Sequence, residues 1–167
     1  FKVVTVREYQ VDEERNSANV KVPQVEVAAT DENADSDTVE QAKVSADAIN
    51  FDINEETNKL IEEFKKSMEN EEGYQNIYID SNVKLDTDDL FSLELILYQG
   101  AGSGYEQHKH YTVDKKTGKE LSLKDLCGDD YIDTISEEIK TQMREQMAAD
   151  ETVQYWLDDP EVEEWNF

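Results

Sequence analysis

Residues 90–98 alternate regularly between apolar and polar side chains. The apolar positions are Phe91, Leu93, Leu95 and Leu97, and the other face carries Ser92, Glu94 and Tyr98, with Ile96 as the exception. A period of two places successive side chains on opposite faces of an extended chain, so this segment is predicted to be a half-buried antiparallel strand. The six residues that follow include three glycines. Such a glycine loop permits a tight corner or a close approach to a partner.

Other segments have the β-branched or alternating composition of strands. They cover residues 2–9, 18–27, 74–85 and 105–114, and residues 120–123 can pair briefly. Pro23 interrupts the second of them, and a proline inside a strand pattern indicates an edge strand, a bulge or a break. Residues 11–18 are a polar connector suited to a hairpin, and Gly118 provides the permissive backbone for the turn at residues 114–119. Ser122 is predicted to cap the helical turn that holds Leu126.

Two longer segments repeat their apolar residues every three or four positions, which is typical of amphipathic helices. The first runs from about Ala46 to Asn70, and Asp129 or Asp130 is predicted to cap the second. The second helix carries an apolar stripe made up of Ile132, Ile135, Ile139, Met143 and Met147. Core is the favoured interpretation of this stripe, and a methionine-rich recognition surface is the alternative. The pattern therefore predicts an α+β fold, with an antiparallel sheet of about four to five strands packed against two main amphipathic helices.

The chain is predicted to form one structural domain overall, with residues 1–45 contributing N-terminal strands and an acidic mobile segment, and residues 46–167 forming the α+β part. The acidic segment contains Asp31, Asn33, Asp35 and Asp37, which resemble the start of an EF-hand calcium loop. Ser36 stands where the loop needs glycine, and Ala42 stands where a bidentate glutamate should close it. A solvated acidic segment is the favoured interpretation, and calcium binding is the alternative.

The charge balance is strongly acidic, with 16 Lys and Arg against 41 Asp and Glu and a formal net charge of -25. Nucleic acid and anionic membrane surfaces would repel such a chain. A basic protein, calcium or solvent are the partners that this charge allows. No apolar run approaches the roughly 18 residues of a membrane span.

Candidate chemistry is sparse. Cys127 is the only cysteine, and two aspartates follow close behind it, so their charge would raise the thiol pKa and disfavour a nucleophile. His108 and His110 could point to one side of a strand and share a metal, but two ligands do not make a site, and surface histidines are the favoured interpretation. The sequence therefore supports no enzymatic activity, no cofactor and no metal site.

Three segments together resemble a known family. They are residues 88–126 (DDLFSLELILYQGAGSGYEQHKHYTVDKKTGKELSLKDL), residues 131–147 (YIDTISEEIKTQMREQM) and residues 155–159 (YWLDD). The chain resembles the ectodomain of the RsiV family of membrane-bound anti-sigma factors, which control extracytoplasmic-function sigma factors such as sigma V. The resemblance covers most of the chain and is weakest from about Ala28 to Ser45.

The resemblance implies a receptor on the extracellular face of a single-pass bacterial membrane protein. Family members bind C-type lysozyme and block its cleft, and binding exposes them to signal peptidase and then to an intramembrane protease, which frees the sigma factor. The family's lysozyme-binding loop corresponds here to Gly102, Ser103, Gly104 and Tyr105. Those lysozymes are strongly basic, which agrees with the acidic charge of this chain.

One departure from the family pattern is visible. The loop here is richer in glycine. The resemblance also implies C-terminal strands with Pro and Tyr contacts, which are expected to lie beyond Phe167 or to be provided by another chain. A related alternative remains open, because similar domains accompany peptidoglycan deacetylases. The chain would then be a non-catalytic accessory domain of a peptidoglycan-modifying enzyme.

Overall fold

The computed structural model describes residues 1–28, 35–70 and 73–157. The chain consists of two compact units, Phe1–Glu120 and Leu121–Phe167. Each unit is described by itself. The predicted division of the chain into residues 1–45 and residues 46–167 stays a prediction. The predicted single structural domain also stays a prediction.

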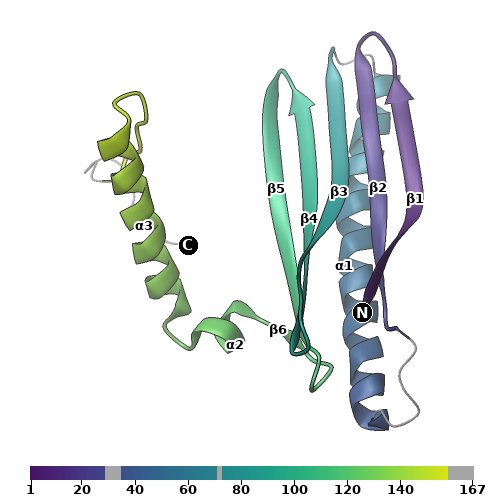
Figure 1. Cartoon of the computed structure of the whole chain (residues 1–167). Coiled ribbons are helices and arrows are strands. Elements are labelled where there is room, and N and C mark those ends of the chain that lie inside the picture. The colour runs from purple at the N-terminus through teal and green to yellow at the C-terminus, as the bar shows by residue number, and fades with distance from the viewer. Residues whose placement is uncertain (29–34, 71–72, 158–167) are drawn as a thin grey trace. The chain divides into compact units, whose positions relative to one another are not determined.

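A six-stranded sheet in the order β1-β2-β3-β4-β5-β6 dominates the first unit (Figure 1). The strands are β1 (Lys2–Asp12), β2 (Asn16–Glu26), β3 (Gln75–Asp86), β4 (Leu90–Ala101), β5 (Ser103–Asp114) and β6 (Glu120–Leu121). The predicted α+β fold is confirmed, with six strands in place of about four to five.

One pair in this sheet is parallel, which the sequence pattern did not predict. β2 and β3 run in the same direction from Asn16↔Gln75 to Val20↔Ile79, while β1–β2, β3–β4 and β4–β5 are antiparallel. A parallel pair needs a crossover connection, and here the connection contains helix α1 (Ser36–Glu69). The start of β3 is thereby placed beside the β1–β2 turn.

Helix α1 packs along one face of the sheet and buries the main core (Figure 1). The helix contributes Ile49, Ile53, Ile61 and Phe64 to the core, and β4 contributes Phe91, Leu93, Leu95 and Leu97. The alternation predicted for residues 90–98 is therefore confirmed. The opposite face of β3, β4 and β5 carries polar side chains, and no helix in the described part of the first unit covers it.

Helix α1 begins ten residues before its predicted start near Ala46, so the expectation of a non-helical segment up to residue 45 is wrong from Ser36 onward. Asp35 is the N-cap, and its carboxylate accepts a hydrogen bond from the Thr38 amide. Tertiary contacts then stabilise this first part of the helix, where Ala42 and Ser45 are buried. Asp31 and Asn33, half of the calcium-like pattern, lie outside the described residues.

Pro23 lies where the register of the β1–β2 pair shifts, between Thr5 and Arg7. Thr5 pairs with Pro23 and Arg7 pairs with Val22, so β1 has one extra residue at this point. The bulge is one of the three outcomes that the proline indicated, and it arises because proline has no amide hydrogen to donate.

The second unit contains α2 (Leu123–Cys127) and α3 (Tyr131–Ala149). Ser122 caps α2 in a capping box with Asp125, as its position predicted. The apolar stripe of α3 is less buried than predicted: Ile132 is exposed, and the other four members are half-buried. Ser136 is the buried residue of this helix. No helix in the described ranges combines the length and apolar composition that a membrane crossing requires.

Candidate functional site

The predicted glycine loop is the tip of a long hairpin. β4 and β5 pair continuously from Leu90↔Asp114 to Ala101↔Ser103, and Gly102 alone lies between the two strands. Gly102 has a φ of +84°, which favours glycine and closes the turn. The expectation of a six-residue loop is therefore wrong, because cross-strand hydrogen bonds hold its outer residues as strand.

Gly100 and Gly104 pair across the hairpin beneath the ring of Tyr98. A β-carbon at position 104 would lie 2.6 Å from the Tyr98 hydroxyl oxygen, and one at position 100 would lie 3.0 Å from it. The two glycines thus leave the space that the tyrosine ring occupies. The small residues shape this face of the tip and do not make it flexible.

Two other segments lie beside the hairpin tip. The β1–β2 turn is fixed by a 2.9 Å hydrogen bond from the Glu13 amide to the Asn16 carbonyl, and the Gln75 amide donates to the Arg15 carbonyl at 2.9 Å. A groove of about 360 Å³ runs between this turn, Tyr74 and the hairpin tip, and we call it the end groove. Gly102, Ser103 and Gly104 line it together with Tyr98.

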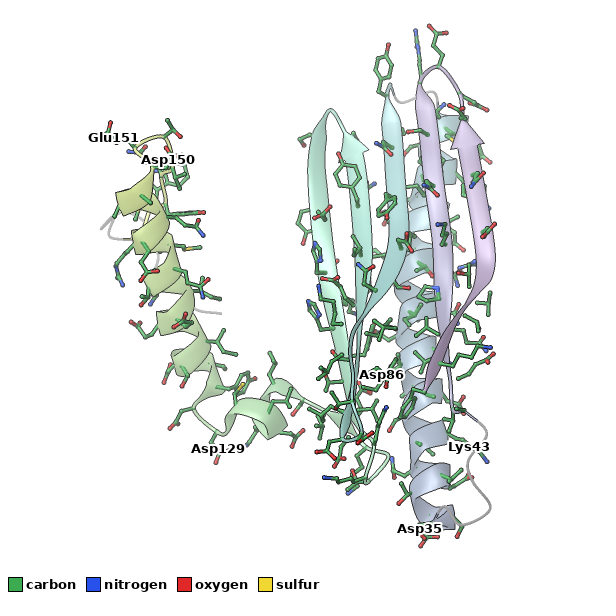
Figure 2. The ribbon with its side chains drawn as sticks, in the orientation of Figure 1. Asp35, Lys43, Asp86, Asp129, Asp150 and Glu151 are labelled. Atoms are coloured by element: carbon green, nitrogen blue, oxygen red, sulfur yellow. The ribbon has the colours of Figure 1, made fainter. Side chains whose placement is uncertain are left out.

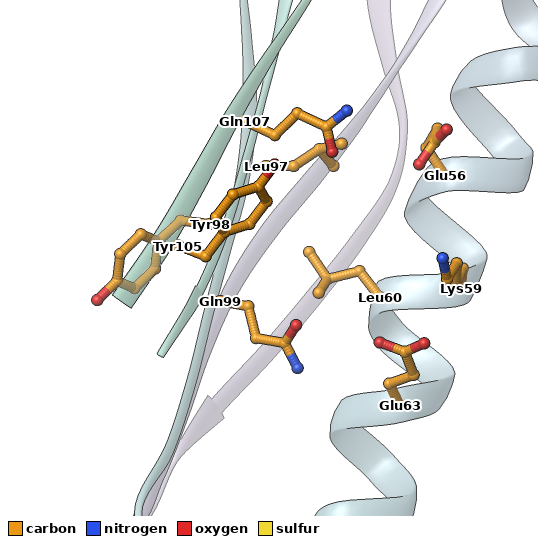
Figure 3. A pocket seen from close by; sticks show the side chains of 9 residues that line it. All are labelled: Glu56, Lys59, Leu60, Glu63, Leu97, Tyr98, Gln99, Tyr105 and Gln107. Carbon is orange, nitrogen blue, oxygen red and sulfur yellow. The ribbon is translucent and has the colours of Figure 1, made fainter. Parts of the chain in front are cut away.

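Tyr105 lines a different hollow. It belongs to a cleft of about 140 Å³ between α1 and the β4–β5 hairpin, with Leu60 and Leu97 among its apolar residues and Gln99 and Gln107 among its polar ones (Figure 3). Its side chain is 68% exposed. The four predicted site residues are therefore brought to one end of the sheet, but they are divided between two hollows.

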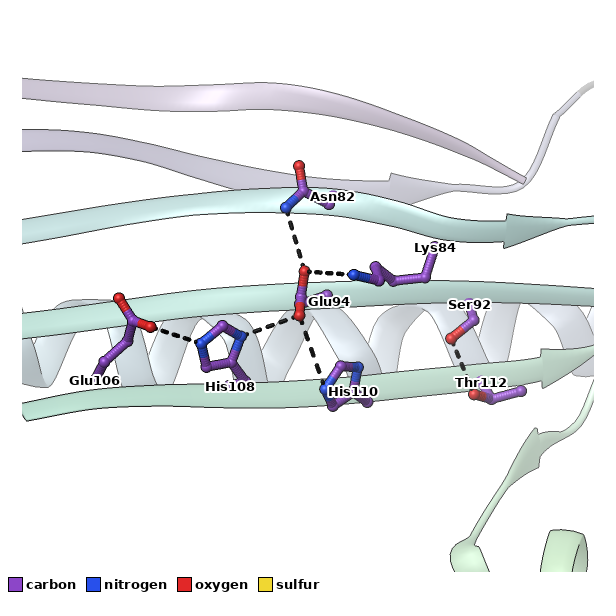
Figure 4. A network of polar contacts seen from close by, with 8 residues as sticks. All are labelled: Asn82, Lys84, Ser92, Glu94, Glu106, His108, His110 and Thr112. Atoms are coloured by element: carbon purple, nitrogen blue, oxygen red, sulfur yellow. Dashed lines mark hydrogen bonds and ion pairs between the residues drawn. The ribbon is translucent and has the colours of Figure 1, made fainter. Parts of the chain in front are cut away.

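The open face of the sheet carries a polar cluster centred on Glu94 (Figure 4). The carboxylate accepts hydrogen bonds from Asn82 at 3.2 Å and Lys84 at 3.3 Å, and lies 3.0 Å from Nδ1 of His108. These partners, His108 foremost, lower the pKa of Glu94 to about 2. The other ring nitrogen of His108 lies 2.9 Å from Glu106, and both carboxylates, Glu106 foremost, raise the His108 pKa.

This cluster has the character of an ion-pair network. Both ring nitrogens of His108 already contact carboxylates, and His110 Nε2 lies 4.0 Å from Glu94. Within the described ranges, no group of three or more His, Cys, Asp or Glu is arranged to hold a metal ion. Cys127 is exposed, and it lies in the second unit.

A second polar network joins α1 to β5 on the core side of the sheet. Lys109 donates to Asp52 at 2.7 Å and to Glu56 at 3.0 Å, and the Tyr111 hydroxyl donates to Asp52 at 2.6 Å. Burial tends to raise the pKa of Asp52, but the hydrogen bonds from Lys109 and Tyr111 outweigh it, so the pKa is lowered. This network links the middle of the hairpin, where Lys109 pairs with Leu95, to helix α1.

Comparison with known proteins finds a sequence relative that covers most of this chain. No protein-family model matches the chain. The anti-sigma-V factor RsiV of Bacillus subtilis (strain 168) is 33% identical over 164 residues, which is 97% of this chain. The resemblance to RsiV is confirmed. The chain spans 53% of the length of RsiV, about half of that relative.

Two solved structures are also similar. A DUF3298 family protein from Pseudomonas aeruginosa PAO1 has a TM-score of 0.49 and 17% identity, covering 92% of this chain and 69% of its own. A member of the same family from Bacteroides fragilis has a TM-score of 0.41 and 17% identity, covering 93% of this chain and 70% of its own. Both similarities are too distant to indicate a function, so RsiV is the relative on which a functional proposal can rest.

Sequence reasoning misses part of the surface beside the tip. The alternating pattern places Tyr74 in the next strand, but it precedes β3, and its side chain is 69% exposed. For residues 11–18 the pattern indicates only a polar hairpin connector. Their position beside the tip depends on the parallel β2–β3 pair, for which the local sequence pattern gives no signal.

Proposed function

We propose that this chain is the extracytoplasmic sensory domain of an anti-sigma factor, that it binds C-type lysozyme, and that it has no catalytic activity of its own. Binding would block the active-site cleft of lysozyme. It would also trigger proteolysis by signal peptidase and an intramembrane protease, releasing an extracytoplasmic-function sigma factor such as sigma V. The observation that carries this proposal is the 33% identity with RsiV over 97% of the chain.

The shape of the hairpin tip is consistent with insertion into a groove. Gly102, Ser103 and Gly104 place small side chains or none at the tip, so that the backbone can approach a partner closely. Tyr105 adds a large, exposed aromatic surface next to them, and tyrosine is enriched among the residues that carry binding energy. We assign these four residues to lysozyme binding.

Charge supports the same partner class. The net charge of -25 attracts a basic protein over a distance set by the salt concentration. The screening length is about 30 Å at about 0.01 M salt and about 8 Å at about 0.15 M. Association with basic lysozyme is therefore expected to be fast at low salt and slower at high salt.

Isothermal titration calorimetry with C-type lysozyme tests the proposal. The 167-residue chain, and the longest form of the protein that its gene encodes, are titrated at both salt concentrations, and muramidase activity is measured in parallel. The expected result is a stoichiometric complex that inhibits muramidase and weakens with salt. Absence of a complex with both forms at low salt would contradict the proposal.

A further inference from the structure

The end groove combines acidic and aromatic side chains on a rigid frame. Glu13 and Glu14 line it from the β1–β2 turn, Tyr74 lines it from the start of β3, and Tyr98 lines it from β4. Among the described residues of this lining, Arg15 is the one cation, so carboxylates outnumber cations there. We propose that the end groove binds a lysine or arginine side chain of a basic partner protein, beside Glu13, Glu14 and Tyr74.

The frame holds the groove open before any partner arrives. Backbone hydrogen bonds fix the β1–β2 turn to itself and to β3, and the tip beside it is paired along its whole length. A preformed groove avoids the ordering cost that a flexible loop would incur on binding. The pairings Asn16↔Gln75 and Asn76↔Gly100 place all three segments at one end of one sheet.

The exposed aromatic ring gives the groove its preference for a cation. Tyr74 is 69% exposed, and the face of an aromatic ring attracts ammonium and guanidinium groups. The same unit already contains such a contact, because Lys65 Nζ lies 5.0 Å from the centre of the Tyr9 ring. Glu14 makes no hydrogen bond or ion pair within the described residues, so its carboxylate is available to a partner.

This inference rests on the proposed function, because the basic partner is taken to be the lysozyme that the hairpin tip binds. It extends the contact surface from the tip to the β1–β2 turn and Tyr74. The occupant is specified by its chemistry, a cationic side chain on a protein surface, which complements the carboxylates of the groove and the acidic charge of the whole chain.

A charge reversal with a matched control separates the groove from the overall charge. Glu14→Lys and Asp88→Lys both change the formal net charge from -25 to -23, so they alter long-range attraction equally. Asp88 lies in the β3–β4 turn, two residues after Asp86, which is labelled in Figure 2, whereas the end groove is lined by Gln75 and Asn76 at the opposite end of β3. We expect Glu14→Lys to weaken lysozyme binding about fivefold or more, and Asp88→Lys to change it less than about twofold.

A second pair of variants tests the aromatic contact. Tyr74 and Phe51 are equally exposed, at 69%, but Phe51 lies on α1 outside the groove. Tyr74→Ala is expected to weaken binding about tenfold or more, while Phe51→Ala leaves it unchanged. Melting temperatures of all four variants establish that each remains folded.

The outcomes discriminate between the two proposals. If the unmodified chain binds lysozyme and all four variants bind equally well, the groove assignment is wrong and the lysozyme proposal stands. If neither the 167-residue chain nor the longest form that its gene encodes binds lysozyme at low salt, both the groove assignment and the lysozyme proposal are wrong. If the chain alone forms a dimer that Glu14→Lys dissociates, the occupant is a second copy of this chain, and the inference is overturned.

Discussion

Gly118 lies directly against the backbone of Ala42. A β-carbon at position 118 would lie 2.6 Å from the Ala42 amide nitrogen and 2.4 Å from the Thr38 carbonyl oxygen. The turn between β5 and β6 therefore contacts the first part of α1 backbone to backbone. This contact explains why the helix extends so far before its predicted start.

Gly118→Ala is expected to destabilise the chain by about 2–5 kcal/mol, because it combines a strained positive φ with a clash against rigid backbone. Gly102→Ala is the matched control. Gly102 also has a positive φ, but a β-carbon there would have no described atom within 4 Å. A cost of only about 1–2 kcal/mol is therefore expected for the control. Urea unfolding of both variants measures the difference, and equal costs would show that the Ala42 contact is unimportant.

Ser45 forms the second connection between this turn and α1. Its hydroxyl donates to the Gly118 carbonyl at 2.7 Å and accepts from the Glu120 amide at 3.1 Å, in a buried position. Ser45→Ala leaves both backbone groups without this partner, so a loss of about 1–3 kcal/mol in unfolding free energy is expected. Ser92→Ala, which removes a hydrogen bond on the open face, should cost less because water can replace the hydroxyl. The prediction is wrong if the two costs are equal.

The Glu94–His108 pair gives the stability of the sheet a defined pH dependence. The pKa of His108 is raised above 6.5 in the folded chain, so its contribution is complete below about pH 6.5 and is lost as pH rises through the folded pKa. The pKa of Glu94 falls from 4.5 to about 2, so its contribution is present above about pH 4.5 and is lost as pH falls toward 2. The pair stabilises most between these two limits.

His108→Gln removes the upper limit of this window. The unmodified chain should exceed the variant in stability by more at about pH 5.5 than at about pH 9. The reason is that only the unmodified chain has a His108 that loses its charge as the pH rises. Melting temperatures at the two pH values measure this difference. His110→Gln is the control, because His110 is farther from Glu94, at 4.0 Å. A pH-independent difference between the unmodified chain and His108→Gln would contradict the assignment.

Gly104→Trp is expected to abolish lysozyme binding while lowering the melting temperature only slightly. The new side chain would displace the Tyr98 ring, whose hydroxyl is the closest atom to position 104 and can move away. It would also fill the end groove beside the tip. Thr112→Trp is the control, since position 112 lies on the same face of β5 at the opposite end of the strand. Equal loss of stability and binding in Gly104→Trp would show that Gly104 has a structural role only.

Local patterns predicted most of the individual elements. The alternation at residues 90–98, the Ser122 cap and the break in register near Pro23 each depend on neighbours in the chain, and each appears in the structure. The predicted site residues also lie together at an exposed tip. Their paired strand geometry was missed, because the cross-strand hydrogen bonds that fix Gly100 and Gly104 depend on the partner strand.

The sequence by itself determined the α+β class, the acidic charge and the resemblance to RsiV, because these follow from composition, short-range periodicity and residue identity. Only the tertiary structure decided the parallel β2–β3 pair, the early start of α1 and the end groove. Each of these depends on contacts between residues far apart in the chain, such as Ser45 with Gly118 and Arg15 with Gln75. Pairings of this kind are set by the packing of the whole sheet against α1, and no single segment encodes them.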